Sequence, residues 1–127
     1  MLPLGAQREP GPRMFKHSLD HHPSFRAVLA AAPYIFELAR AANDDALFAQ
    51  LALAAGELVS GFREPHGSPS RAGAHYRAWT LVRELDRNVS ALRVNRRAPV
   101  PILARAQRAI DRADVMIGAL PGVISAT

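Results

Sequence analysis

The feature that most constrains this chain is an apolar repeat in steps of four, three, four and three residues. It is formed by Ala78, Val82, Leu85, Val89 and Leu92. This spacing places the five side chains along one side of an α-helix and is typical of the seam of a left-handed helix bundle. A second segment repeats the alternation at Leu103, Ala106, Ile110, Ala113, Ile117 and Leu120. The two repeats predict two helices that pack together through these apolar side chains.

Proline, glycine and capping residues divide the chain into four predicted helices. Ser24 and Ser70 are good N-caps, and Asn43 or Asp44 should cap another helix. Pro33 should kink or restart the first helix because proline lacks an N–H. The predicted ranges are 25–42, 45–60, 70–96 and 101–120. The expected inward residues of the first two helices are Leu29, Ala32, Phe36, Ala39, Leu47, Leu51, Ala54 and Leu58.

Four helices with short connections predict an all-α protein, an antiparallel up-down four-helix bundle over residues 24–122. The 127 residues suffice for one domain, and 24 alanines with only 6% aromatic residues favour closely packed helices. Residues 1–23 are rich in Pro, Gly, His and charge and lack apolar periodicity, so we expect a flexible N-terminal arm. Residues 123–127 are expected to form a C-terminal tail.

The first two predicted helices are apolar nearly all round. Between residues 27 and 62 the only charged residues are Glu37, Arg40, Asp44, Asp45 and Glu57. A helix without a broad polar face has to be covered on more than one side. We therefore predict a ring-like homo-oligomer; the alternative is that the surplus residues thicken a single core. The candidate interface residues are Tyr34, Phe48, Leu53 and Val59.

The chemistry that the sequence lacks excludes several classes of protein. Without cysteine there are no disulfides and no thiolate metal sites. There is no inward Glu-x-x-His pair, Gly-rich phosphate loop or Gly-x-Ser-x-Gly elbow, and the acids are scattered, so we predict no enzyme and no cofactor. His17, His21 and His22 beside Asp20 form a histidine cluster with the i, i+4 spacing that could hold a metal if this arm were helical. Pro23 and its surroundings favour a solvated arm instead, so no metal is expected. The lone His66 and His75 are expected at the surface or in an interface.

The uncharged stretches fall short of the roughly 20 apolar residues that span a bilayer, and no secretory signal is recognisable. We therefore expect a cytoplasmic protein without a membrane partner.

Arginine provides 15 of the 16 cations, and residues 63–114 hold eleven arginines against five acids. This surplus predicts a surface that contacts the phosphates of DNA or RNA. The candidate residues are Arg93, Arg96, Arg97, Arg105, Arg108 and Arg112.

The alternative for these arginines is a solvated face, on which Asp111 and Asp114 form pairs along the helix surface. Trp79, the single tryptophan, lies beside the seam, where a packing or interface role is favoured over base stacking. A structural or adaptor protein that binds a protein partner through its apolar helices is therefore the alternative function. A small-molecule regulator with a pocket between helices has no further support in the sequence.

Two motifs carry a family resemblance. The helix end Glu57-Leu-Val-Ser-Gly-Phe62 and the later Leu81-Val-Arg-Glu-Leu-Asp-Arg-Asn-Val89 resemble a bacterial four-helix-bundle family, although Glu57 replaces a usual Asn and Ser60 a usual Glu. That family includes proteins encoded in 23S ribosomal RNA intervening sequences and the accessory variability proteins of diversity-generating retroelements. The resemblance implies a homo-oligomeric, often pentameric, basic barrel without catalysis. Its retroelement branch implies nucleic acid and a reverse transcriptase as partners, so that the protein would be an accessory factor to a nucleic-acid enzyme.

Overall fold

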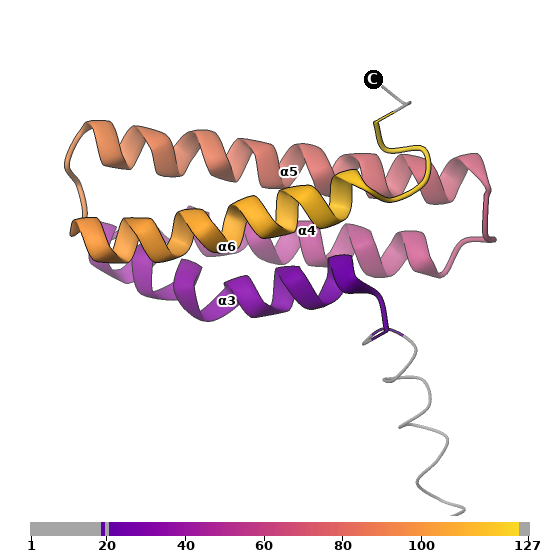
Figure 1. The fold of residues 1–127 in the computed structure, drawn as a ribbon, viewed down its shortest axis with the longest axis horizontal. Helices are drawn as coiled ribbons and strands as arrows, with labels where there is room; N and C mark the ends of the chain where they lie inside the picture. Colours follow the sequence, from indigo (N-terminus) through magenta and orange to yellow (C-terminus); the bar gives the residue numbers. More distant parts are fainter. Residues whose placement is uncertain (1–18, 20, 125–127) are drawn as a thin grey trace, which may run out of the picture.

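The computed structural model describes residue 19 and residues 21–124, and this part of the chain contains helices and no strands. Most of the predicted N-terminal arm and the last three residues lie outside this range. The four helices are joined by short links (Figure 1). They are α3 (Pro23–Ala42), α4 (Ala46–Phe62), α5 (Pro69–Val94) and α6 (Val100–Gly118).

The helices lie side by side with their axes along the long dimension of the molecule (Figure 1). Helix α3 packs against α4 and α6, and α5 packs against the same two helices. The core between them consists mainly of Ala, Val, Leu and Ile, so the small side chains allow close approach. This arrangement confirms an all-α protein with a four-helix core.

The helix ends follow from local chemistry, although the three predicted N-cap positions differ from the observed ones. Ser68, not Ser70, caps α5, because its hydroxyl accepts from the Arg71 N–H at 3.2 Å and Pro69 occupies the first helical position. Ser24 lies inside α3 and is buried, and its hydroxyl has no partner among the described residues. Asp45, and not Asn43 or Asp44, is the N-cap residue of α4, and its side chain forms no capping hydrogen bond. The neighbouring Asp44 carboxylate accepts from the Ala46 N–H at 3.2 Å.

The predicted apolar stripes of α4 and α5 are buried, and that of α6 is buried up to Ile117, whereas the stripe of α3 is wrong at Leu29 and Phe36. Leu29 and Phe36 are 48% and 50% exposed, although both were expected to face inward. The reason is that α3 carries apolar residues on nearly every side, so the helical spacing of these residues is compatible with more than one buried face. The residues of α3 that are buried in the core are Ala27, Val28, Ala31, Ile35, Leu38, Ala39 and Ala42.

Helix α3 is continuous through Pro33, so the predicted restart of the helix at this residue is wrong. Pro33 cannot donate to the Leu29 carbonyl four residues earlier. Both residues lie on the exposed side of α3. Water can therefore replace the missing Pro33 donor at this carbonyl, which explains why the helix tolerates the proline.

The packed region extends beyond both predicted boundaries. His22, assigned to the arm, stacks on Phe62 with ring centroids 3.7 Å apart. Val123, assigned to the tail, is 0% exposed. The turn before it approaches α5 so closely that a Cβ on Gly122 would overlap the Ala72 side chain, and Gly122 has a φ of 84°. Both ends of the four-helix region are therefore fixed by side-chain packing.

Candidate nucleic-acid interface

The predicted arginines of α6 lie at the surface, but they are not equivalent. Arg108 and Arg112 are exposed, and neither forms an ion pair within the described part of the chain. Arg105 is half-buried, and its Nη2 donates to both carboxylate oxygens of Glu37 on α3, at 3.2 and 3.1 Å. The charge of Arg105 is thus largely compensated within the protein, whereas Arg108 and Arg112 keep their charges available for a ligand.

A groove lies between α3 and α6, and the arginines surround it. It consists of two adjoining hollows of about 250 and 160 Å³, which share Ala27, Ala30 and Arg112. We call it the α3–α6 groove and define it by all residues that line the two hollows. These are Pro23, Arg26, Ala27, Ala30, Tyr34, Arg105, Arg108, Ala109 and Arg112.

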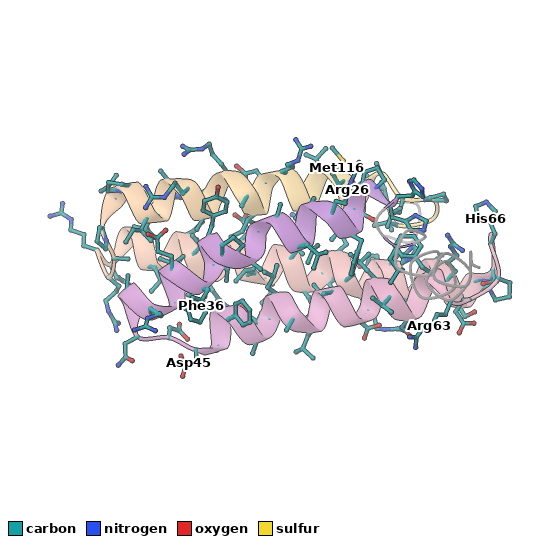
Figure 2. The ribbon with its side chains drawn as sticks, turned by 90° about the horizontal axis from the view of Figure 1, so that it is seen from below. Arg26, Phe36, Asp45, Arg63, His66 and Met116 are labelled. Carbon is teal, nitrogen blue, oxygen red and sulfur yellow. The ribbon has the colours of Figure 1, made fainter. Side chains whose placement is uncertain are left out.

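Arg26 is the cation of this groove that the sequence did not single out. It is exposed and forms no ion pair with another described residue. Figure 2 shows Arg26 near Met116, at the edge where α3 and α6 run next to each other. Because Arg26 and Arg112 are 86 residues apart in sequence, only the packing of α3 on α6 brings them together.

The arginines at the end of α5 extend the basic surface. Arg93 and Arg108 line a further hollow of about 320 Å³. Arg108 also lines the α3–α6 groove, so five arginines, of which only Arg105 has an ion-pair partner among the described residues, line hollows from the end of α5 across α6 to α3. We call Arg26, Arg93, Arg108 and Arg112 the basic band.

Arg96 and Arg97 are exposed in the link between α5 and α6, beyond the hollows of the basic band. The Arg96 N–H donates to the Arg93 carbonyl at 3.2 Å and the Arg97 N–H to the Leu92 carbonyl at 2.9 Å. These two bonds form the Schellman arrangement that ends a helix. Arg96 therefore adopts a φ of 54°, a left-handed conformation that glycine accepts more easily.

Asp111 and Asp114, the acids expected to form pairs on the surface of α6, have hydrogen-bond partners other than the arginines of this helix. Asp114 accepts from the Trp79 indole Nε1 at 2.6 Å and lies 4.0 Å from an Arg83 nitrogen. Asp111 accepts from the Gln107 amide at 2.9 Å. Asp111 and Asp114 therefore form no ion pair with the arginines of α6, and the exposure of Arg108 and Arg112 fits a solvated face as well as a surface that contacts phosphates. The half-buried Trp79 packs against the core, in agreement with the packing role that the sequence favoured.

The four candidate interface residues differ in exposure and in their surroundings. Tyr34 is 40% exposed and lines the α3–α6 groove beside the arginines. Phe48 is 38% exposed and contacts Phe36 edge-on, with ring centroids 5.8 Å apart. Figure 2 shows Phe36 where α3 lies next to α4. Leu53 is 60% exposed, whereas Val59 is only partly exposed.

His75 is not a surface residue as expected, because it is only 1% exposed. Burial first, then the positive charges of Arg71 and His22, lower its pKa to about 4, against the raising effect of a hydrogen bond with the Leu58 backbone. The Phe62 ring lies 4.5 Å from the imidazole, and the imidazole Nε2 has no hydrogen-bond partner among the described residues. His75 is therefore a neutral core residue at physiological pH.

Other chemical candidates are few. In residues 19 and 21–124, no group of three His, Asp or Glu side chains is placed to hold a metal ion. His17 and Asp20, which belong to the histidine cluster considered as a metal site, lie outside the described residues. A hollow of about 150 Å³ at the His75 end is lined by His66, Gly67, Ser68, Arg71, Ala72, His75, Leu120, Pro121 and Gly122.

Comparison of the chain with models of known protein families, with curated proteins and with solved structures gives no match. The resemblance to the four-helix-bundle family thus stays a prediction that rests on residues 57–62 and 81–89. None of the helices described here is both long and apolar enough to cross a membrane.

Proposed function

We propose that this protein binds nucleic acid, without catalysing a reaction, through phosphate contacts of the basic band. The observation that carries this proposal is the placement of Arg26, Arg108 and Arg112 around the α3–α6 groove, with no ion-pair partner for any of them among the described residues. A guanidinium group matches phosphate oxygens with two parallel hydrogen bonds. Phosphate contacts position a protein without reading bases, so DNA and RNA of any sequence should bind.

We further propose that the four helices form an antiparallel up-down bundle and that copies of this bundle associate into a ring-like homo-oligomer in the cytoplasm. Phe36 and Phe48 support this association, because these exposed side chains touch across α3 and α4 and form an apolar patch, and Leu29 is exposed two turns earlier on α3. A second copy would cover this apolar patch and repeat the basic band, so that weak contacts add up to avidity. The family resemblance agrees with a pentamer and with a role as an accessory factor to a nucleic-acid enzyme.

Binding is tested by fluorescence anisotropy with labelled DNA and RNA of mixed sequence, at low and moderate salt. The double variant Arg108→Gln/Arg112→Gln should weaken binding to both polymers by a similar factor. Two lost phosphate contacts should reduce the slope of log Kobs against log salt by about 1.4 to 1.8. Arg105 is kept, because its removal would leave the Glu37 carboxylate unpaired beside the groove.

The matched control is Arg63→Gln/Arg87→Gln, which removes the same charge from two exposed arginines outside the basic band. This control should retain most of the affinity. Absence of binding at low salt, or equal loss in the two double variants, would contradict a specific role of the basic band.

The adaptor function is the second candidate, and the apolar patch is the observation that favours it. Light scattering distinguishes self-association through this patch from the binding of a different protein. A homo-oligomer has a mass that is a multiple of 13.8 kDa, and Phe36→Ser/Phe48→Ser should reduce it to that of one chain. Val94→Ser/Val100→Ser is the control, since these valines are 76% and 75% exposed away from the patch. A monomeric wild-type chain that binds no polyanion would favour the adaptor.

A further inference from the structure

The α3–α6 groove combines positive charge with a free aromatic face. Tyr34 lies among Arg105, Arg108 and Arg112 in the larger hollow of the groove. No ring or guanidinium of the described residues stacks on Tyr34, whereas Phe36, Phe62 and Trp79 each have such a partner. Charge and aromatic surface therefore lie together where the sequence alone placed only an arginine stripe.

The alanines of the groove leave room for a flat group beside Tyr34. Ala27 and Ala30 of α3 and Ala109 of α6 line the hollow of about 250 Å³ with the tyrosine. Methyl side chains keep this part of the groove apolar and shallow, and the arginines lie around it. Such a combination offers one apolar contact and several phosphate contacts to the same ligand.

We propose that the α3–α6 groove binds single-stranded nucleic acid, with an unpaired base stacked on Tyr34 and the adjacent phosphates held by Arg108 and Arg112. This inference rests on the proposed function and specifies its ligand. In a duplex the bases are stacked on each other and are not available to a side chain, whereas a single strand can turn one base outward. Any base has a π-face, so stacking adds preference for single strands without sequence specificity.

The length of the groove fits contacts with more than one phosphate. Arg105 and Arg112 are separated by seven residues of α6, which corresponds to about 10 Å along the helix. Glu37 neutralises the Arg105 end of this row, so the free charge lies at Arg108, Arg112 and Arg26. The strand should therefore run from Tyr34 towards Arg26.

The test compares three labelled ligands of equal length by fluorescence anisotropy: an oligothymidine, an abasic strand with the same phosphates, and a duplex. The wild-type chain should bind the oligothymidine most tightly. Tyr34→Ala should weaken this binding by about 5- to 100-fold, the effect of losing one aromatic stacking platform. The abasic strand should bind Tyr34→Ala and the wild type equally.

Two controls separate stacking from folding. Tyr34→Phe keeps the ring and should retain the affinity for oligothymidine, and Tyr76→Ala, which removes a tyrosine of α5 outside the groove, should also retain it. Photo-crosslinking of the wild-type chain to a strand that carries 5-iodouracil gives a readout without substitution. The crosslinked peptide should contain Tyr34.

The outcomes distinguish the two proposals. If none of the ligands binds at low salt, both the proposed function and this inference are wrong. If oligothymidine, abasic strand and duplex bind equally, and Tyr34→Ala leaves all three unchanged, phosphate binding stands and stacking on Tyr34 is refuted. Crosslinks that map only outside α3 and α6 would also overturn the assignment to this groove.

Discussion

Acidification should destabilise the protein through His75, and the size of the effect follows from its environment. The imidazole is 1% exposed and its pKa in the folded protein is about 4, against 6.5 in an unfolded chain. The folded state therefore binds fewer protons than the unfolded state between these two values. Stability is fully present above about pH 6.5 and is lost as the pH falls from 6.5 through 4, with no further loss from this group below pH 4.

At 1.36 kcal/mol for each pH unit, the shift corresponds to about 3 kcal/mol of unfolding free energy. This is a large fraction of the stability of a domain of this size. The pKa of His22 is also lowered, first by burial and then by Arg71 and His21, so it adds to the effect in the same direction.

The assay is urea denaturation followed by circular dichroism at fixed protein concentration, at pH 7.5, 5.5 and 4.5. His75→Leu is the reference, because leucine has a similar volume and does not titrate. The unfolding free energy of the wild type should fall with pH more steeply than that of His75→Leu, by about 2 to 3 kcal/mol between pH 7.5 and 4.5. Parallel pH profiles for the two proteins would refute the buried, neutral state of His75.

Three further substitutions test other contacts. Gly61→Ala should destabilise the protein by about 1 to 3 kcal/mol in urea denaturation, because the added Cβ would overlap the buried His75 ring; a gain in stability would contradict this packing. Arg96→Gly should raise the unfolding free energy by about 1 kcal/mol, since glycine adopts the left-handed conformation without strain, and unchanged or lower stability would count against that strain. Glu37→Gln should change stability by less than about 1 kcal/mol, because its pair with Arg105 is half exposed. The same variant should tighten binding to oligonucleotides in anisotropy measurements, and weaker binding would contradict the electrostatic role given to the α3–α6 groove.

The inward faces of α4, α5 and α6 were predictable because their apolar residues recur with a clear period. Helix α3 was not, since its outer side is apolar as well, and only the packing against α4 and α6 selects Ile35 over Phe36. His75 lies three residues before Ala78 and thus continues the α5 seam. This spacing could have indicated its burial, but the polarity of histidine favoured the surface.

The candidate site was predictable in its charge and not in its shape. The arginine surplus and the exposed positions of Arg108 and Arg112 follow from the sequence. Arg26 and Tyr34 could not be assigned to the site, because the α3–α6 groove exists only where two helices distant in sequence pack together. The pairing of Arg105 with Glu37, 68 residues away, depends on the same packing.

The central claim is that unpaired arginines on this helical protein bind phosphates, and a salt titration of oligonucleotide binding by the wild-type chain tests it most directly. With three free arginines around the α3–α6 groove, log Kobs for a single strand should fall linearly with log salt, with a slope of about −2 or steeper. Affinity that does not change with salt, or no binding at low salt, would contradict the claim.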